Sequence, residues 1–242
     1  MVRAFMNRRH LLAGAGGLLV GCSSRPKYRL RYRLEIAARV GERVHTGASV
    51  LSMVWEDIGG AANLNGGDAF VREPDGEAIV VDLGEHGKLF GLLTAQGLAD
   101  SGFSVSSPEL ALIPLLSEAE REGLTVSGDD VRQGLSGLTG VRQLAREHWP
   151  AMVRFRDVAD RSTVELADPD NLTSALGASA AIEAVTVSVV DAPVTRRIKN
   201  ELPWLNSLRG SLVWPAPGQP IRVVNRITRK HFIQNEEERG NA

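Results

Sequence analysis

Hydrophobic and polar positions alternate most regularly near the N-terminal end of the chain, at residues 28–40. Every second residue there is aromatic or aliphatic, and most of the intervening residues are arginine or glutamate. A period of two is typical of a β-strand that buries one face and exposes the other. Residues 41–43 form a turn signal, so residues 44–55 are predicted to return beside the first strand as a hairpin.

Shorter patterns of the same kind follow. Apolar runs at residues 69–71 and 78–83 flank the tight-turn signal Pro74, Asp75 and Gly76, and so predict a second hairpin. Further strands are predicted at residues 88–93, 153–155, 185–189 and 221–227.

The predicted helices are short, and proline or glycine limits each of them. Pro114 is expected to begin a helix that ends at Gly123, and a capping box at residues 127–130 precedes a glycine-weakened helix. The remaining predicted helices cover residues 140–149, 168–177 and 195–202. The pattern favours the α+β class: a strand-rich chain with a mainly antiparallel sheet and a few short helices.

Residues 6–24 combine a basic segment, an apolar run and a cysteine. The run is shorter than the roughly 20 residues of a membrane span and suits a secretory signal. The segment resembles the lipobox signal of bacterial lipoproteins, and the residues that carry this resemblance are Arg8, Arg9, Leu19, Val20, Gly21 and Cys22. It implies cleavage before Cys22 and acylation of that residue, and hence a lipid anchor. An ordinary signal with an incidental cysteine is the alternative.

These signals divide the chain and suggest its location. We expect a signal peptide at 1–21, a lipidated tether at 22–27, one α+β domain at 28–233 with a possible sub-boundary near 105–150, and a disordered tail at 234–242. Arg8 and Arg9 resemble a twin-arginine export signal, although a plain basic segment fits equally well. Ser23 is not the aspartate associated with inner-membrane retention in enteric bacteria, so the periplasmic face of the outer membrane is slightly favoured.

Charge and composition exclude several kinds of function. The formal net charge of −1 becomes −4 after removal of residues 1–21, which contain Arg3, Arg8 and Arg9 and no acid. Bulk electrostatics therefore disfavours a nucleic-acid partner. Cys22 is the only cysteine, so lipidation would leave no thiol for catalysis, disulfides or metal binding.

Linear catalytic motifs are also missing. The chain has no G-x-S-x-G elbow, phosphate-binding glycine loop or H-E-x-x-H helix. Its histidines are scattered, although His45 and His86 would cluster if their strands were neighbours. Single hydrogen-bonded histidines are the simpler interpretation. We expect no cofactor, no metal and no catalytic residue.

The arginines of the 28–40 strand have two interpretations. A solvated face of charges would discourage edge-to-edge pairing of the strand. Alternatively, because the tether is short, the same arginines would meet anionic lipid headgroups. We favour the solvated face.

The most distinctive later stretch is PVTRRIKNELPWL at residues 193–205. Together with FRDVADRSTVE at residues 155–165, it resembles a group of uncharacterised proteobacterial envelope proteins, a resemblance that implies no known activity. Ile198 and Leu202 are spaced to pack on one side of a short helix. Core packing is one interpretation of the stretch, and a partner-binding corner of Trp204, Arg196 and Arg197 is the other.

These observations favour a membrane-anchored lipoprotein that faces the periplasm. We expect its globular part to be a non-enzymatic binding or interaction module, for envelope assembly or as an immunity-type inhibitor. Its partners would be membrane lipid, through acylated Cys22, and an unknown protein. The alternative is a small envelope hydrolase whose site has no linear signature.

Overall fold

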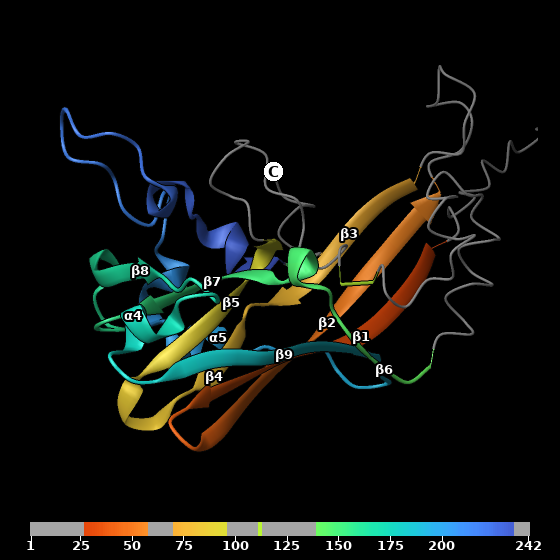
Figure 1. Cartoon of the computed structure of the whole chain (residues 1–242). Coiled ribbons are helices and arrows are strands. Elements are labelled where there is room, and N and C mark those ends of the chain that lie inside the picture. Colours follow the sequence, from red (N-terminus) through yellow and green to blue (C-terminus); the bar gives the residue numbers. More distant parts are fainter. Residues whose placement is uncertain (1–26, 58–69, 96–110, 113–138, 235–242) are drawn as a thin grey trace, which may run out of the picture.

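The computed structural model describes residues 27–57, 70–95, 111–112 and 139–234 (Figure 1). In these ranges the strands form two sheets, and each neighbouring pair of strands is antiparallel. The predicted strand-rich, mainly antiparallel character is thus confirmed. Helical segments here are single turns, so the α+β class describes the fold only loosely.

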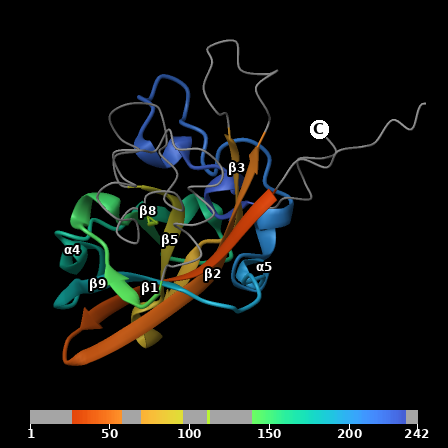
Figure 2. The ribbon, with the colours of Figure 1, turned by 90° about the vertical axis from the view of Figure 1, so that its right-hand side faces the viewer.

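The first sheet has the strand order β10-β3-β2-β1-β9-β6. Its members are β1 (Lys27–Val40), β2 (Arg43–Asp57), β3 (Phe70–Glu77), β6 (Val141–Gln143), β9 (Ala180–Val189) and β10 (Ile233–Gln234). The long hairpin of β1 and β2 forms its centre and extends beyond the second sheet (Figures 1 and 2).

The central hairpin agrees with the sequence prediction. Leu34 and Ile36 are buried on one face of β1, whereas Arg33 on the other face is exposed. β1 and β2 pair without a shift, and two residues join Val40 to its partner Arg43. Gly41 has a φ of +58°, a conformation that favours glycine in such tight hairpin turns.

The second sheet has the order β4-β5-β7-β8 and is buried on both faces. Its members are β4 (Ile79–Asp82), β5 (Lys88–Ala95), β7 (Pro150–Phe155) and β8 (Val164–Leu166). Val81 and Leu89 belong to the core shared with the first sheet. Phe90 and Val153 belong to a second core on the opposite face.

The two sheets meet most closely where glycine removes a side chain. A Cβ atom on Gly47 of β2 would lie 2.1 Å from the carbonyl oxygen of Val80 in β4. A Cβ atom on Gly91 of β5 would lie 2.6 Å from Cδ1 of Ile36 in β1. Both contacts are shorter than packed atoms tolerate, so glycine at these positions sets the separation of the sheets.

A third layer covers the outer face of the second sheet and contains most of the C-terminal chain (blue in Figure 1). Leu202, Leu205 and Phe232 are fully buried there. Its short helical turns are α5 (Ile198–Glu201), η6 (Pro203–Asn206), η7 (Val223–Arg226) and η8 (Arg229–His231). The other helical turns are η2 (Gly84–His86), η4 (Arg146–His148), η5 (Arg161–Thr163) and α4 (Leu172–Leu176).

Several predictions for individual elements are wrong. Pro74, Asp75 and Gly76 lie inside β3, so they do not turn a hairpin, and β4 pairs with β5 in the other sheet. Residues 140–149 form β6 and a 3-10 turn where a helix was predicted. Residues 221–227 contain η7 where a strand was predicted. Pairing with distant strands replaces the local preference at β3 and β6, whereas local bonds close η4 and η7.

Two predicted helices are shorter in the structure. α4 begins at Leu172, and Gly177, with a φ of +68°, ends it as the sequence predicts. α5 begins at Ile198, because Thr195 is bonded to β2 instead. The helices predicted after Pro114 and after residues 127–130 lie outside the described residues.

Candidate binding groove at the edge of β2

The residues predicted for signal recognition and lipidation lie outside the described part of the chain. They are Arg8, Arg9, Leu19, Val20, Gly21 and Cys22. Within the described residues, no helix is both long enough and apolar enough to cross a membrane.

The distinctive stretch at residues 193–205 begins by crossing to the edge of β2. The amide of Thr195 donates to the carbonyl oxygen of Val50 at 3.0 Å, and the amide of Val50 donates to Thr195 Oγ1 at 2.9 Å. The pairing of β3 with β2 ends at Ser52 and Asp75. Thr195 bonds to the next outward-pointing residue of β2, Val50. One main-chain bond and one bond to the Thr195 hydroxyl thus hold the stretch to the first sheet.

Two buried carboxylates of β3 hold the next residues. Asp75 is 6% exposed and accepts bonds of 2.5 and 2.6 Å from Nη2 of Arg196. Glu77 is 1% exposed, and its Oε2 accepts the amides of Arg197 at 2.5 Å and Ile198 at 2.9 Å. These bonds compensate the desolvation of both carboxylates, because each keeps charge-assisted partners.

Trp204 is partly buried and packs against the second core. Its indole N–H donates to the carbonyl oxygen of Val158 at 2.8 Å. Its ring lies 5.5 Å from that of Phe155 and 6.2 Å from that of Phe232, both edge-on. The three residues predicted as a partner-binding corner thus have different surroundings: Trp204 packs against the second core, Arg196 pairs with Asp75, and Arg197 lines a groove.

This groove follows β2 where the two sheets meet, and its volume is about 520 Å³. That volume is within the range of small-molecule sites and also leaves room for a short extended peptide. The lining residues come from both sheets and from the crossing stretch: Arg33, Thr46, Gly47, Ala48, Val50, Val80, Asp82, Lys88, Thr195, Arg197 and Glu201. We name it the β2 groove.

The main-chain edge of β2 is open along this groove. The N–H and C=O groups of Val50 point away from β1, because Thr195 bonds to both. Alternate residues of a strand point to the same side, so Val44, Thr46 and Ala48 present their groups there too. Among the described residues, the only bond to these groups is from Arg197 Nη2 to the Ala48 carbonyl, at 3.3 Å.

Three positions of this edge also lack the side chains that usually discourage strand pairing. Natural edge strands commonly carry charged side chains, proline or a bulge. Val44, Thr46 and Ala48 are uncharged, and β2 pairs with β1 without a bulge. The edge is therefore able to accept another extended chain.

The charges around the groove leave one cation available. Arg33 pairs with Glu35 at 2.7 Å, and Lys88 pairs with Glu201. Asp82 accepts the amide of Gly84 at 2.9 Å. Arg197 is exposed and forms no ion pair with any described residue. A carboxylate in the groove would find its partner there.

His45 and His86, for which the sequence allowed a cluster, have separate hydrogen-bond or ion-pair partners. His45 and His86 both line a second cavity of about 590 Å³, where the turn at Gly41 faces η2. His45 Nδ1 lies 3.0 Å from the carbonyl oxygen of Asp82. Within the described ranges, no group of three or more His, Cys, Asp or Glu side chains is arranged to hold a metal ion.

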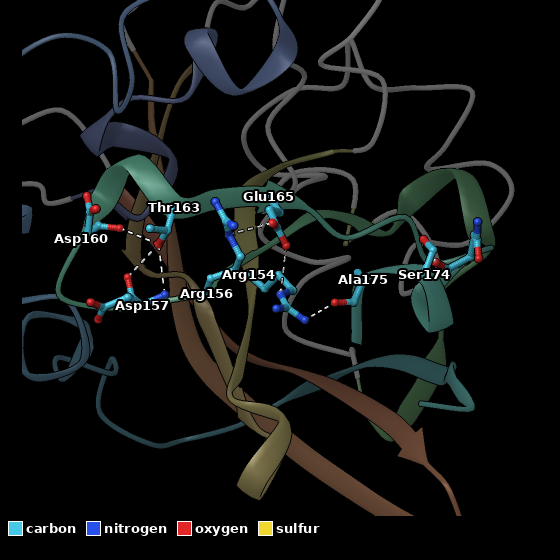
Figure 3. A network of polar contacts seen from close by, with 9 residues as sticks. Arg154, Arg156, Asp157, Asp160, Thr163, Glu165, Ser174 and Ala175 are labelled. Carbon is cyan, nitrogen blue, oxygen red and sulfur yellow. Dashed lines mark hydrogen bonds and ion pairs between the residues drawn. The ribbon is translucent and has the colours of Figure 1, made fainter. Parts of the chain in front are cut away.

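The FRDVADRSTVE stretch forms the polar connection between β7 and β8 (Figure 3). Asp160 caps η5 through the amide of Ser162 at 2.8 Å, and this bonding to Ser162 lowers the pKa of Asp160. Glu165 lies between Arg154 and Arg156, at 3.3 and 3.0 Å. These contacts explain the stretch as a stabilised turn.

Comparison with known proteins identifies no relative. No family model, no curated protein and no solved structure matches the chain. Interpretation of the groove therefore depends on its own geometry.

Sequence reasoning missed most of the groove. Arg33, Lys88 and Thr195 are far apart in the chain and belong to no common motif. The sequence singled out Arg197 as a partner-binding residue together with Trp204, and it treated Arg33 only as part of the arginine face of the first strand. The open edge has no linear signal either, since it depends on where β3 stops pairing with β2.

Proposed function

We propose that the protein is a non-enzymatic binding module of the bacterial cell envelope, which holds an extended segment of a partner protein in the β2 groove. The observation that carries this proposal is the open main-chain edge at Val44, Thr46 and Ala48, which borders the groove. A segment added as a strand would bond to these groups, as in recognition by β-strand addition.

Specificity would come from the charges beside the edge. Arg197 is the exposed cation without a carboxylate partner in the described residues. An acidic side chain of the bound segment would pair with it, and the Ala48 carbonyl would be released to the incoming strand. The proposed ligand is therefore an extended peptide with at least one acidic residue.

The envelope location is supported by the lipobox-like segment that ends at Cys22. We propose acylation of Cys22 and a periplasm-facing position, at the outer rather than the inner membrane. Two or more acyl chains give stable attachment, whereas one gives marginal attachment. An anchored module of this kind would present the β2 groove to other envelope proteins.

Hydrogen exchange tests the open edge without a known partner. The amides of Thr46 and Ala48 should exchange quickly in the free protein, and those of His45 and Gly47, which point toward β1, should be protected. Equal protection of all four amides would show that the edge is already covered and would contradict the proposal.

Peptides selected for affinity to the protein test binding in the groove. Peptides selected from a random displayed library against the purified protein should be extended and contain an acidic residue. Thr46→Pro should abolish their binding, because proline removes an edge donor without breaking a bond to β1. Arg197→Glu should weaken binding by at least about tenfold, the cost of a lost charge-assisted bond.

The matched control is Lys199→Ser, which removes an exposed cation of α5 that does not line the groove. It should leave peptide binding unchanged. Binding that survives Thr46→Pro and Arg197→Glu in folded protein would place the site elsewhere.

A further inference from the structure

The C-terminal layer forms a second surface, and the charged residues in its last part are all of one sign. Residues 202–234 contain five Lys or Arg residues and no Asp or Glu. The protein as a whole has a formal net charge of −1. This segment therefore has a net positive charge within a mildly acidic chain.

The same segment carries the two most exposed large hydrophobic side chains of the described residues. Trp214 is 69% exposed and Ile221 is 67% exposed. They lie near the two ends of a loop at residues 213–222, which projects from the C-terminal layer away from both sheets (Figures 1 and 2). Isolated exposed apolar residues are ordinary, but two on one projecting loop form a distinct surface.

The loop is held in a defined shape. Buried Asn225 connects its two ends: Nδ2 donates to the carbonyl oxygen of Val213 at 2.9 Å, and Oδ1 accepts the amide of Arg222 at 2.7 Å. The amide of Leu212 donates to the carbonyl oxygen of Ile227 at 2.7 Å. Three prolines restrict the backbone between these bonds. The ordered loop thus holds the two apolar side chains in a solvent-exposed position.

Exposed basic residues lie at the end of this loop and in the segments that flank it in the chain. Arg209, Arg222, Arg226 and Lys230 are exposed, and none of them forms an ion pair with another described residue. Arg209 precedes Gly210, which is the neighbour of the Trp214 ring, and Arg222 follows Ile221. We use the name loop face for these four basic residues together with Trp214 and Ile221.

We propose that the loop face docks on a bilayer surface that contains anionic lipid. Tryptophan and an aliphatic residue on a projecting loop suit the headgroup region, where an aromatic ring with one polar group is stable. The unpaired arginines and lysine match the negative surface potential. A soft bilayer accepts such a projection without a complementary pocket. This contact is independent of the β2 groove and of acylation at Cys22.

Vesicle binding tests the proposal with the full chain carrying Cys22→Ser, so that no acyl chain contributes. The protein should cosediment with phosphatidylcholine vesicles that contain phosphatidylglycerol, and only weakly with pure phosphatidylcholine. Raising the salt concentration should weaken the binding. The double change Arg222→Ser and Arg226→Ser should reduce it about 25-fold, at roughly fivefold per cation. Trp214→Ala should reduce it about tenfold or more.

Matched controls distinguish binding through the loop face from non-specific binding to vesicles. Val141→Ser removes a side chain that is 64% exposed on β6, and the pair Arg161→Ser and Lys199→Ser removes two exposed cations from other elements. Both should bind vesicles like the parent protein. Fluorescence gives a second readout: brominated phosphatidylcholine should quench the parent, and Trp214→Phe should lose that quenching while the three other tryptophans remain.

Three results would overturn the proposal. The first is no binding to anionic vesicles. The second is binding that the Trp214 and arginine variants do not reduce, which would place the contact elsewhere in the chain. The third is salt-sensitive binding to immobilised polyglutamate without any vesicle binding, which would assign the loop face to an acidic protein.

Discussion

His231 in η8 shows how burial of one side chain links stability to pH. The residue is 4% exposed, and burial, followed by the nearby charge of Lys230, lowers its pKa from 6.5 to about 4. Its Nδ1 accepts the amide of Thr228 at 2.9 Å, which requires that nitrogen to be unprotonated. The folded protein therefore keeps the ring neutral at pH values where the unfolded chain protonates it.

The resulting prediction has a defined sign. The contribution of neutral His231 to stability should be complete above about pH 6.5 and should be lost as pH falls toward about 4, because only the unfolded state takes up the proton. The full loss is on the order of 3 kcal/mol. Urea unfolding across this range should show a steeper pH dependence in the parent than in His231→Gln. Identical slopes would contradict the assignment.

The buried carboxylates on β3 depend on hydrogen-bond donors from distant segments of the chain. Asp75 and Glu77 occur in a stretch that looks like a polar turn when only its neighbours are considered. Arg196 and the amide of Ile198 provide their bonds, more than a hundred residues later in the chain. Without those partners, the desolvation of either carboxylate would exclude it from the interior.

At the scale of one element, β1 should tolerate change on one face only. Leu34 is 1% exposed, so Leu34→Asp would bury an unpaired carboxylate at a cost of several kcal/mol, against a typical total stability of 5–15 kcal/mol. The variant should unfold or fail to accumulate. Within the described residues Arg31 pairs with fully exposed Asp191 alone, so Arg31→Ser should cost within about 0.5 kcal/mol.

Chemical denaturation of both variants measures this difference. The serine variant should keep the midpoint of the parent, and the aspartate variant should lack a cooperative transition. Equal tolerance at Leu34 and Arg31 would be incompatible with the observed faces of β1.

β3 explains why a proline within a strand was misread as a turn. Ser52 and Asp75 are paired on the hydrogen-bonding side of β2, so the next pair, Met53 with Pro74, needs no bond from residue 74 to β2. The absent N–H group of Pro74 therefore leaves no ladder bond unmade. Local propensity indicates a turn, and the register of the pairing permits the strand.

For the whole molecule, the contact between the sheets should be sensitive at Gly47. A methyl group there would meet the Val80 carbonyl, which is backbone and cannot rotate away. Gly47→Ala should destabilise the protein by about 2–3 kcal/mol, which overpacked interiors commonly show. The melting temperature should fall by several degrees.

Ala48→Val is the matched control for this change. It adds a larger side chain at the next position, which belongs to the opposite face of β2, and should change stability within about 0.5 kcal/mol. A similar loss from both variants would mean that β2 resists any added volume, and that the sheet contact at Gly47 is not special.

Attachment is the other property of the whole molecule that can be tested. Wild-type protein should incorporate labelled fatty acid and sediment with membranes, whereas Cys22→Ser should do neither, because the thioether and the new amino terminus would both be lost. Both proteins should be compared at matched expression. Absence of label from the wild-type protein would refute the lipoprotein proposal.

The sequence by itself determined the features that depend on neighbouring residues. Strict alternation predicted the buried and exposed faces of β1, the glycine at residue 41 predicted the turn into β2, and Gly177 predicted the end of α4. These features follow from strand periodicity and from the freedom of glycine to adopt positive φ. Neither depends on where the element later packs.

Only the tertiary structure decided which elements meet. It placed β3 beside β2 and β4 in the other sheet, brought Thr195 to the end of the β3 pairing, and so formed the open edge and the β2 groove. It also packed Trp204 against the second core and left Trp214 exposed to water, although both are tryptophans next to a proline. The reason is physical: a local pattern specifies which face of an element is apolar, whereas pairing and burial depend on contacts between segments far apart in the chain.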